Sequence, residues 1–156
     1  KQVKIEAEFL RLGLTGGLIT TADVIRWADR QIENGEADAT VLDLSLSTNS
    51  SPGKITTLLA AVPGACERIL PLNMLLASCS VLLSEGKMKH RELIAGLGKV
   101  IRANKVPEQV RNEIAWLEEQ ADMADNEGFG SESEARDEVK RYVAAYTQYR
   151  SWVPCL

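Results

Sequence analysis

Aromatic residues and histidine are scarce in this sequence, and each shortage excludes a class of structure or site. Aromatic residues make up 5% of the 156 residues, so the core must consist mainly of Leu, Ile, Val and Ala, which suits helices better than sheets. His90 is the single histidine, which excludes any metal site that needs two histidines. Because Lys87, Lys89 and Arg91 lie beside it in the sequence, we expect a neutral, solvated imidazole at a helix start rather than a catalytic base.

Cysteines and long apolar runs are also few. The chain has three cysteines, Cys66, Cys79 and Cys155, and neither their odd number nor their spacing matches a metal or redox motif. We therefore expect them to be small buried hydrophobic residues in a reducing cytoplasm rather than partners in disulfides. No stretch approaches the roughly 18 apolar residues of a membrane span. Residues 1–10 carry Glu6 and Glu8 and lack the apolar core of a signal peptide. We therefore expect a cytoplasmic protein that does not bind membranes.

The glycine-rich segments do not match nucleotide-binding motifs. Residues 13–17 follow a helical pattern rather than a strand and lack the Lys-Ser/Thr pair of a phosphate loop. Gly96 and Gly98 lie inside a helical pattern, where we expect them to allow close packing of a neighbouring helix.

What the sequence does contain is helix signals along its whole length. Thr20 with Asp23 predicts a capping box, Ser51 before Pro52 predicts a helix start, and Ser131 is expected to cap the last long helix, with Glu134 as its reciprocal partner. Pro107 is expected to open another helix. The expected helices cover about residues 5–13, 20–34, 38–47, 51–62, 66–84, 89–103, 107–124 and 131–146.

Apolar spacing predicts which helix faces are buried. In residues 107–124 the spacing of four and three indicates the inner face of a bundle helix, made of Val110, Ile114, Leu117, Ala121 and Ala124. In residues 20–34 the expected inner face is Val24 or Ile25, Ala28 and Ile32, with Trp27 beside it. The short helix over residues 38–47 has a strand as its alternative, because Leu42, Leu44 and Leu46 alternate. The overall prediction is an all-α single domain over residues 1–156, a compact bundle of about eight short antiparallel helices.

Charge is distributed unevenly along the chain. Residues 118–138 hold nine acidic residues and one basic residue, whereas the rest of the chain holds 17 basic and 13 acidic residues. Such a segment is either a solvated helix face with Phe129 turned inward or an acidic docking surface with Phe129 as its aromatic anchor, and an acidic surface steers basic partners. The candidate partner-binding residues are Glu118, Asp122, Asp125, Glu127, Phe129, Glu132 and Glu134.

Two other charge patterns have functional interpretations. Glu118 with Asp122, or Asp122 with Asp125, has helical spacing suited to a divalent cation, but no second acidic motif accompanies the pair. Seven cations between residues 87 and 111 could contact RNA, although no aromatic residue is interleaved for base stacking. They are Lys87, Lys89, Arg91, Lys99, Arg102, Lys105 and Arg111. We expect no metal, no cofactor and no nucleic acid, and a solvated face for these cations.

Four segments carry a family resemblance: residues 9–14 (Phe-Leu-Arg-Leu-Gly-Leu), 24–29 (Val-Ile-Arg-Trp-Ala-Asp), 44–46 (Leu-Ser-Leu) and 62–64 (Val-Pro-Gly). In these the chain resembles small bacterial helical proteins whose functional analogues are the immunity proteins of polymorphic and contact-dependent toxin systems. The resemblance implies a cytoplasmic inhibitor that binds the C-terminal toxin domain of a secreted effector, often a basic nuclease.

The expected function is therefore binding rather than catalysis. An acidic inhibitor suits a nuclease toxin, because the nuclease needs a cationic site for phosphates. We expect a non-enzymatic immunity protein, monomeric when free, that blocks the active site of its cognate toxin domain. The alternatives are a helical adaptor or scaffold module, in which Trp27 or Trp116 would carry binding, and a metal-dependent helical enzyme.

Overall fold

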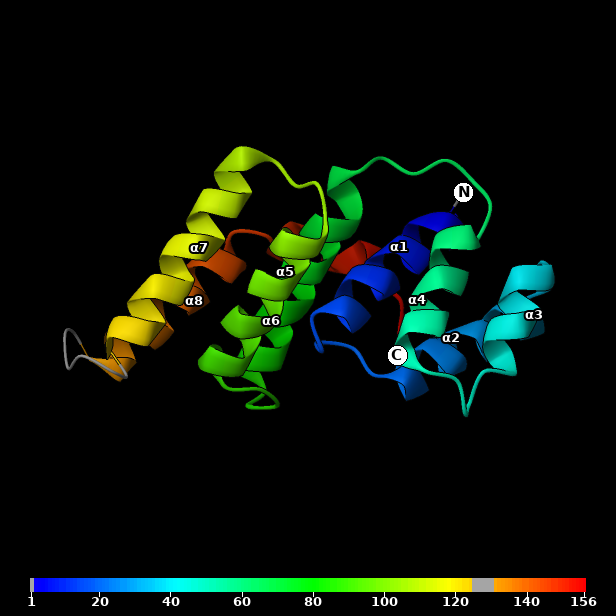
Figure 1. The fold of residues 1–156 in the computed structure, drawn as a ribbon, viewed down its shortest axis with the longest axis horizontal. Coiled ribbons are helices and arrows are strands. Elements are labelled where there is room, and N and C mark those ends of the chain that lie inside the picture. The colour runs from blue at the N-terminus through cyan, green and yellow to red at the C-terminus, as the bar shows by residue number, and fades with distance from the viewer. Residues whose placement is uncertain (1, 125–130) are drawn as a thin grey trace. The chain divides into compact units, whose positions relative to one another are not determined.

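The computed structural model describes residues 2–124 and 131–156, and this part of the chain is helical without any strand. The predicted all-α class is confirmed. Residues 38–47 form a helix and not the alternative strand. The elements, drawn in Figure 1, are α1 (Gln2–Thr15), α2 (Thr21–Glu33), α3 (Ala39–Ser45), α4 (Pro52–Ala61), α5 (Ile69–Ser84), α6 (His90–Ala103), α7 (Glu108–Asp122), α8 (Glu132–Ala144) and the 3-10 helix η2 (Thr147–Trp152).

The backbone contacts divide the chain into two compact units. Unit 1 comprises residues 1–75 and 152–156, and unit 2 comprises residues 76–151. Helix α5 belongs to both, since its residues up to Leu75 fall in unit 1 and those from Leu76 fall in unit 2. The prediction of a single domain stays a prediction.

Local capping signals set the helix starts as the sequence predicted. The Thr20 hydroxyl accepts a hydrogen bond from the Asp23 amide at 3.2 Å, and the Asp23 carboxylate accepts one from the Thr20 amide at 3.0 Å. Ser51 caps α4 through the Lys54 amide, and Pro52 occupies the first turn of that helix. Each bond satisfies an amide that has no carbonyl partner within the helix.

Unit 1 packs α1 against α4 and α2 against α3, with α3 also contacting α4. Its core is built from apolar side chains with no exposed surface: Ala7, Phe9, Leu10, Val24, Ala28, Val41, Leu44, Ile55 and Leu59. The Lys4 ammonium donates to the Ala60 carbonyl at 2.8 Å, which ties α1 to the end of α4. Burial therefore follows the apolar stripes of four helices.

Two details of α1 and α2 differ from the sequence prediction. Helix α1 continues through Gly13 to Thr15, and the buried Gly13 leaves room for Ile19 after the following turn. In α2 the buried residues include Gln31, whereas Ile32 is 38% exposed. Val24 and Gln31 are seven residues apart and share a helix face with Ala28. Packing on α3 and α1 selects that face, so Ile32 lies at its edge.

Helix α5 begins at Ile69, three residues after the expected start, and it is continuous through Pro71. Pro71 is the third residue of the helix. The first amides of a helix have no intrahelical acceptor, so a proline there removes no hydrogen bond. Leu72, Met74, Leu75, Leu76, Ala77 and Cys79 are all buried.

Unit 2 contains α6, α7 and α8, each of which contacts the other two. The predicted inner face of α7 is confirmed for Val110, Ile114, Leu117 and Ala121, while Ala124 is half-buried beyond the helix end. Helix α7 begins at Glu108, with Pro107 as the residue before it. Ala135, Val139 and Val143 form the buried stripe of α8. The apolar faces of α7 and α8 thus pack against α6 in a three-helix arrangement.

The cysteines and the histidine depart from their expected surroundings. Only Cys79 is buried, which raises the pKa of its thiol to about 12, whereas Cys66 is half-buried and Cys155 exposed. All three cysteines are free. His90 was expected to be solvated, but it is 5% exposed and belongs to the buried face of α6. Its pKa is lowered, first by this burial and then by Arg91 and Arg136, while Glu132 opposes the shift.

Candidate functional site

The structure describes four of the seven predicted partner-binding residues. Glu118 and Asp122 lie on α7, and Glu132 and Glu134 lie in the first turn of α8. The other three, Asp125, Glu127 and Phe129, lie outside the described residues. The predicted aromatic anchor is therefore among the residues on which the structure gives no account.

Two of the four carboxylates are paired with arginines of α6. Arg102 Nη1 lies 3.1 Å from Glu118 Oε1, and Arg91 Nε lies 3.5 Å from Glu132 Oε1. An ion pair within the molecule reduces the field that a carboxylate presents to a partner. Glu118 and Glu132 are thus weaker candidates for binding than the sequence indicated.

Asp122 and Glu134 are exposed, and no ion pair to either is formed within residues 2–124 and 131–156. Asp122 borders a small hollow of about 220 Å³ together with Glu118 and Arg91. The Glu134 amide donates to the Ser131 hydroxyl at 3.0 Å, so Ser131 caps α8 as predicted, while the predicted reciprocal bond from the Ser131 amide to the Glu134 carboxylate is not formed. These two carboxylates remain available to a partner.

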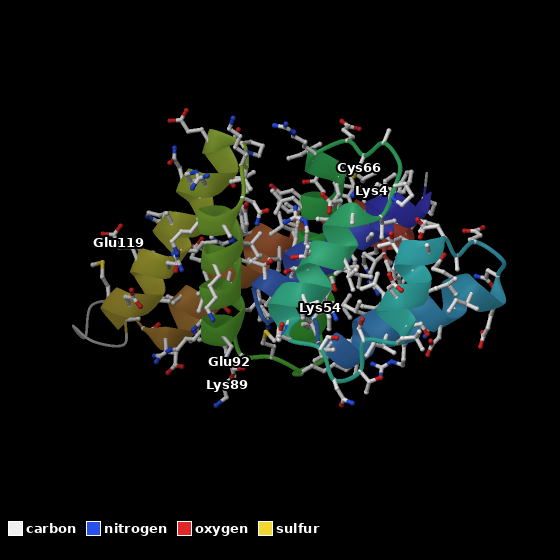
Figure 2. All side chains as sticks on the ribbon, turned by 45° about the vertical axis from the view of Figure 1, so that its right-hand side comes forward. Lys4, Lys54, Cys66, Lys89, Glu92 and Glu119 are labelled. Carbon is white, nitrogen blue, oxygen red and sulfur yellow. The ribbon has the colours of Figure 1, made fainter. Side chains whose placement is uncertain are left out.

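Asp122 belongs to a broader exposed strip along α7, which we call the α7 outer face. Its members recur at helical spacing, and every one of them is exposed: Glu108, Gln109, Asn112, Ala115, Trp116, Glu119 and Asp122. Glu119 projects outward from α7 in Figure 2. The strip holds three carboxylates and no cation. Because it lies opposite the buried stripe of Val110 and Ile114, it is presented to solvent along the full helix.

A groove beside Trp116 was not anticipated from the sequence. Trp116 is 48% exposed, and with Leu117 and Tyr142 it lines a groove of about 430 Å³ whose walls come from α7 and α8. Figure 1 shows these two helices side by side. Polar residues complete the lining: Asn112, Glu113, Glu138 and Arg141. The signal that could have revealed it is the position of Trp116, a large aromatic residue that falls outside the apolar stripe of α7.

The polar groups of the groove are unevenly satisfied. The Arg141 guanidinium donates to Glu138 at 2.6 Å, whereas Glu113 has no ion pair with any basic side chain of the described residues. The Tyr142 hydroxyl is buried without a well-formed hydrogen bond there. Burial, reinforced by Tyr146 and Glu113, raises the pKa of Tyr142, so its hydroxyl remains protonated. The groove therefore combines an aromatic wall, a protonated hydroxyl and a carboxylate that has no ion pair with a basic side chain of the described residues.

Metal binding and membrane insertion find little support in the described residues. In the part of the chain that the structure describes, no group of three or more His, Cys, Asp or Glu residues is placed to hold a metal ion. In the same ranges, none of the helices combines the length and apolar character needed to cross a bilayer. The alternative of a metal-dependent enzyme gains no support from these residues.

Comparison with known proteins adds no relative. No family model matches the chain, and no curated protein or solved structure shows significant similarity to it. The surfaces of the molecule itself therefore carry the functional assignment.

Proposed function

We propose that the protein is an immunity protein that neutralises a basic toxin domain by binding it through the α7 outer face. The observation that carries the proposal is the composition of this face, which presents Glu108, Glu119 and Asp122 around the exposed Trp116 with no cation among them. An acidic rim speeds encounter with a basic protein, and a central tryptophan supplies buried contact area.

The remaining charge of α7 and α8 supports the same role. Helix α7 carries five acidic residues and one basic residue, and α8 carries four acidic and three basic residues. A nuclease binds phosphates through cations. A row of carboxylates can pair with those cations and thereby exclude the nucleic acid. The inhibitor does not need to catalyse any reaction.

The test is binding to the C-terminal toxin domain encoded next to this protein, measured by calorimetry at low and at physiological salt. Glu119→Lys with Asp122→Lys is expected to weaken binding by at least about tenfold, because two attractions become repulsions. Glu92→Lys is the matched control, since Glu92 is an exposed carboxylate on α6 (Figure 2). Equal affinity of the double variant and the control would remove the α7 outer face from the interface.

A helical adaptor is the second candidate, and the groove beside Trp116 is the observation that favours it. An adaptor that binds by apolar insertion would lose affinity with Trp116→Ser and would respond little to salt or to charge reversal at Asp122. An immunity protein of the proposed kind would lose affinity in both variants, with a steep salt dependence.

A further inference from the structure

A second surface, on unit 1, carries exposed apolar side chains that the proposed function does not use. Leu46 is 84% exposed, Leu42 is 46% exposed and Ile32 is 38% exposed. Leu42 belongs to α3, Leu46 follows its last turn, and Ile32 lies in the last turn of α2. Single exposed leucines are common on protein surfaces, but neighbouring ones indicate an interaction site.

The three side chains come from the contacting helices α2 and α3 and from the residue that follows α3, and together we call them the α2–α3 ridge. The Ser45 hydroxyl of α3 donates to the Asp29 carboxylate of α2, which fixes the register of the two helices. Ile32 is one turn after Asp29, Leu42 is about one turn before Ser45, and Leu46 follows Ser45 directly. Leu42 and Leu46 are four residues apart and therefore share a helix face.

The chain around the ridge is strongly acidic. Residues 29–46 contain five acidic residues and one basic residue, Arg30. Glu33, Glu36 and Asp43 are exposed, and no lysine or arginine of the described ranges forms an ion pair with them. Asp38 caps α3 by accepting from the Val41 amide at 3.0 Å. The ridge thus lies in a segment whose net charge is strongly negative.

This charge decides which occupant fits. An anionic lipid surface or a nucleic acid would be repelled by the carboxylates. A second copy docking ridge to ridge would bring two acidic rims together, which is also unfavourable. We propose that the α2–α3 ridge docks a basic amphipathic helix of another protein, whose apolar stripe covers Leu42, Leu46 and Ile32 while its lysines or arginines face Glu33, Glu36 and Asp43.

The probe is a fluorescently labelled peptide of about 18 residues, long enough to form a helix, with leucines on one face and lysines on the other. Two control peptides are used: one replaces the leucines with glutamine and the other replaces the lysines with glutamate. Binding to the intact protein is measured by anisotropy. The proposal expects the Leu-Lys peptide to bind in a salt-dependent manner and both control peptides to bind at least about tenfold more weakly.

Site variants locate the binding. The double substitution Leu42→Ser with Leu46→Ser is expected to weaken binding of the Leu-Lys peptide by at least about tenfold, because the contacts of two leucines with the peptide are lost. Trp152→Ser is the matched control, as it removes an exposed apolar side chain that neither proposal uses. Both substitutions are at exposed positions, and unchanged circular dichroism confirms that the variants fold. Amide shifts in a labelled sample are expected to cluster on residues 32–46.

Other results overturn the proposal. A peptide that binds equally well to the Leu42/Leu46 double variant, or whose shifts map to α7 and α8, places the basic-helix site elsewhere. A concentration-dependent dimer in sedimentation that Leu46→Ser abolishes assigns the ridge to a second copy. Binding of anionic vesicles that the double variant loses assigns it to a lipid surface. The toxin-binding test of the α7 outer face uses a different partner and different variants, so the two proposals can fail separately.

Discussion

Gly98 of α6 faces the carboxylate of Glu118 on α7. A methyl group added to Gly98 would lie 2.3 Å from Glu118 Oε2, a distance too short for contact between these atoms. The same carboxylate accepts a hydrogen bond from Arg102 at 3.1 Å. The expectation that glycine here allows close helix packing is confirmed, and the group that it admits is one of the predicted partner-binding carboxylates.

Gly98→Ala is expected to change the free energy of unfolding by no more than about 1 kcal/mol. Alanine favours the helix by up to about 1 kcal/mol relative to glycine. The contact is with the end of a flexible side chain that is partly exposed, so Glu118 can move away at the cost of its pair with Arg102. Urea denaturation of the variant measures the balance. A loss above about 2 kcal/mol would show that Glu118 is held rigidly.

Gly13→Ala is expected to destabilise the protein by about 1–3 kcal/mol. A methyl group added at Gly13 would lie 2.3 Å from Ile19 Cδ1 and 2.6 Å from Cγ1. Ile19 is 5% exposed and branched at Cβ, so it has little freedom to move. Gly53→Ala in α4 is the control, because nothing lies within 4 Å of the position of its added methyl group. Equal stability of the Gly13 and Gly53 variants would contradict the close packing.

Glu6 is expected to make stability fall as pH rises. Its carboxylate accepts from Trp27 Nε1 at 3.2 Å, but burial is the larger influence and raises the pKa above 4.5. The folded state then binds the proton more tightly than the unfolded state. The stabilisation is complete below pH 4.5 and is lost as pH rises through the folded pKa.

The comparison is with Glu6→Gln, which keeps an oxygen acceptor for Trp27 and does not titrate. The free energy of unfolding of the wild-type protein, minus that of the variant, is expected to decrease from about pH 4 to pH 7 in urea titrations. A difference that increases would show that the Trp27 bond outweighs burial, and a constant difference would show that the two influences balance.

His90 is expected to act in the opposite pH direction. Burial lowers its pKa below 6.5, so the unfolded state takes up the proton first. The stabilisation is present above pH 6.5 and is lost as pH falls through the folded pKa. His90→Gln should flatten this part of the stability profile, measured by thermal unfolding between about pH 7.5 and pH 5. If the wild-type and variant profiles are parallel, His90 does not titrate differently on folding.

Much of the helical architecture could be predicted because its signals are local. The Thr20 and Asp23 pair sits within one turn, and the stripe of Val110, Ile114 and Leu117 repeats along one helix. Such features depend on hydrogen bonds to the backbone of the same turn and on spacings of three or four residues. They can therefore be predicted without knowing where distant segments of the chain lie. Residues 38–47, whose apolar pattern also fits a strand, contain a local helix signal, because Asp38 caps the first turn of α3.

The candidate site could be predicted only in part. Its acidic character on α7 was visible in composition, and Asp122 and Glu134 are exposed as a docking surface requires. The groove beside Trp116 could not be predicted, because its second wall is Tyr142, 26 residues further along the chain on another helix. Its formation depends on how α7 and α8 pack.

By itself, then, the sequence determined where helices start, which stripes are apolar and where negative charge accumulates. Only the tertiary structure decided that Gln31 is buried while Ile32 is exposed, and that Arg102 neutralises Glu118 while Asp122 stays free of an ion pair within the described residues. The physical reason is the distance along the chain over which each interaction acts. Backbone hydrogen bonds and caps act within a turn, whereas burial and ion pairing depend on side chains that only the packing of separate helices brings together.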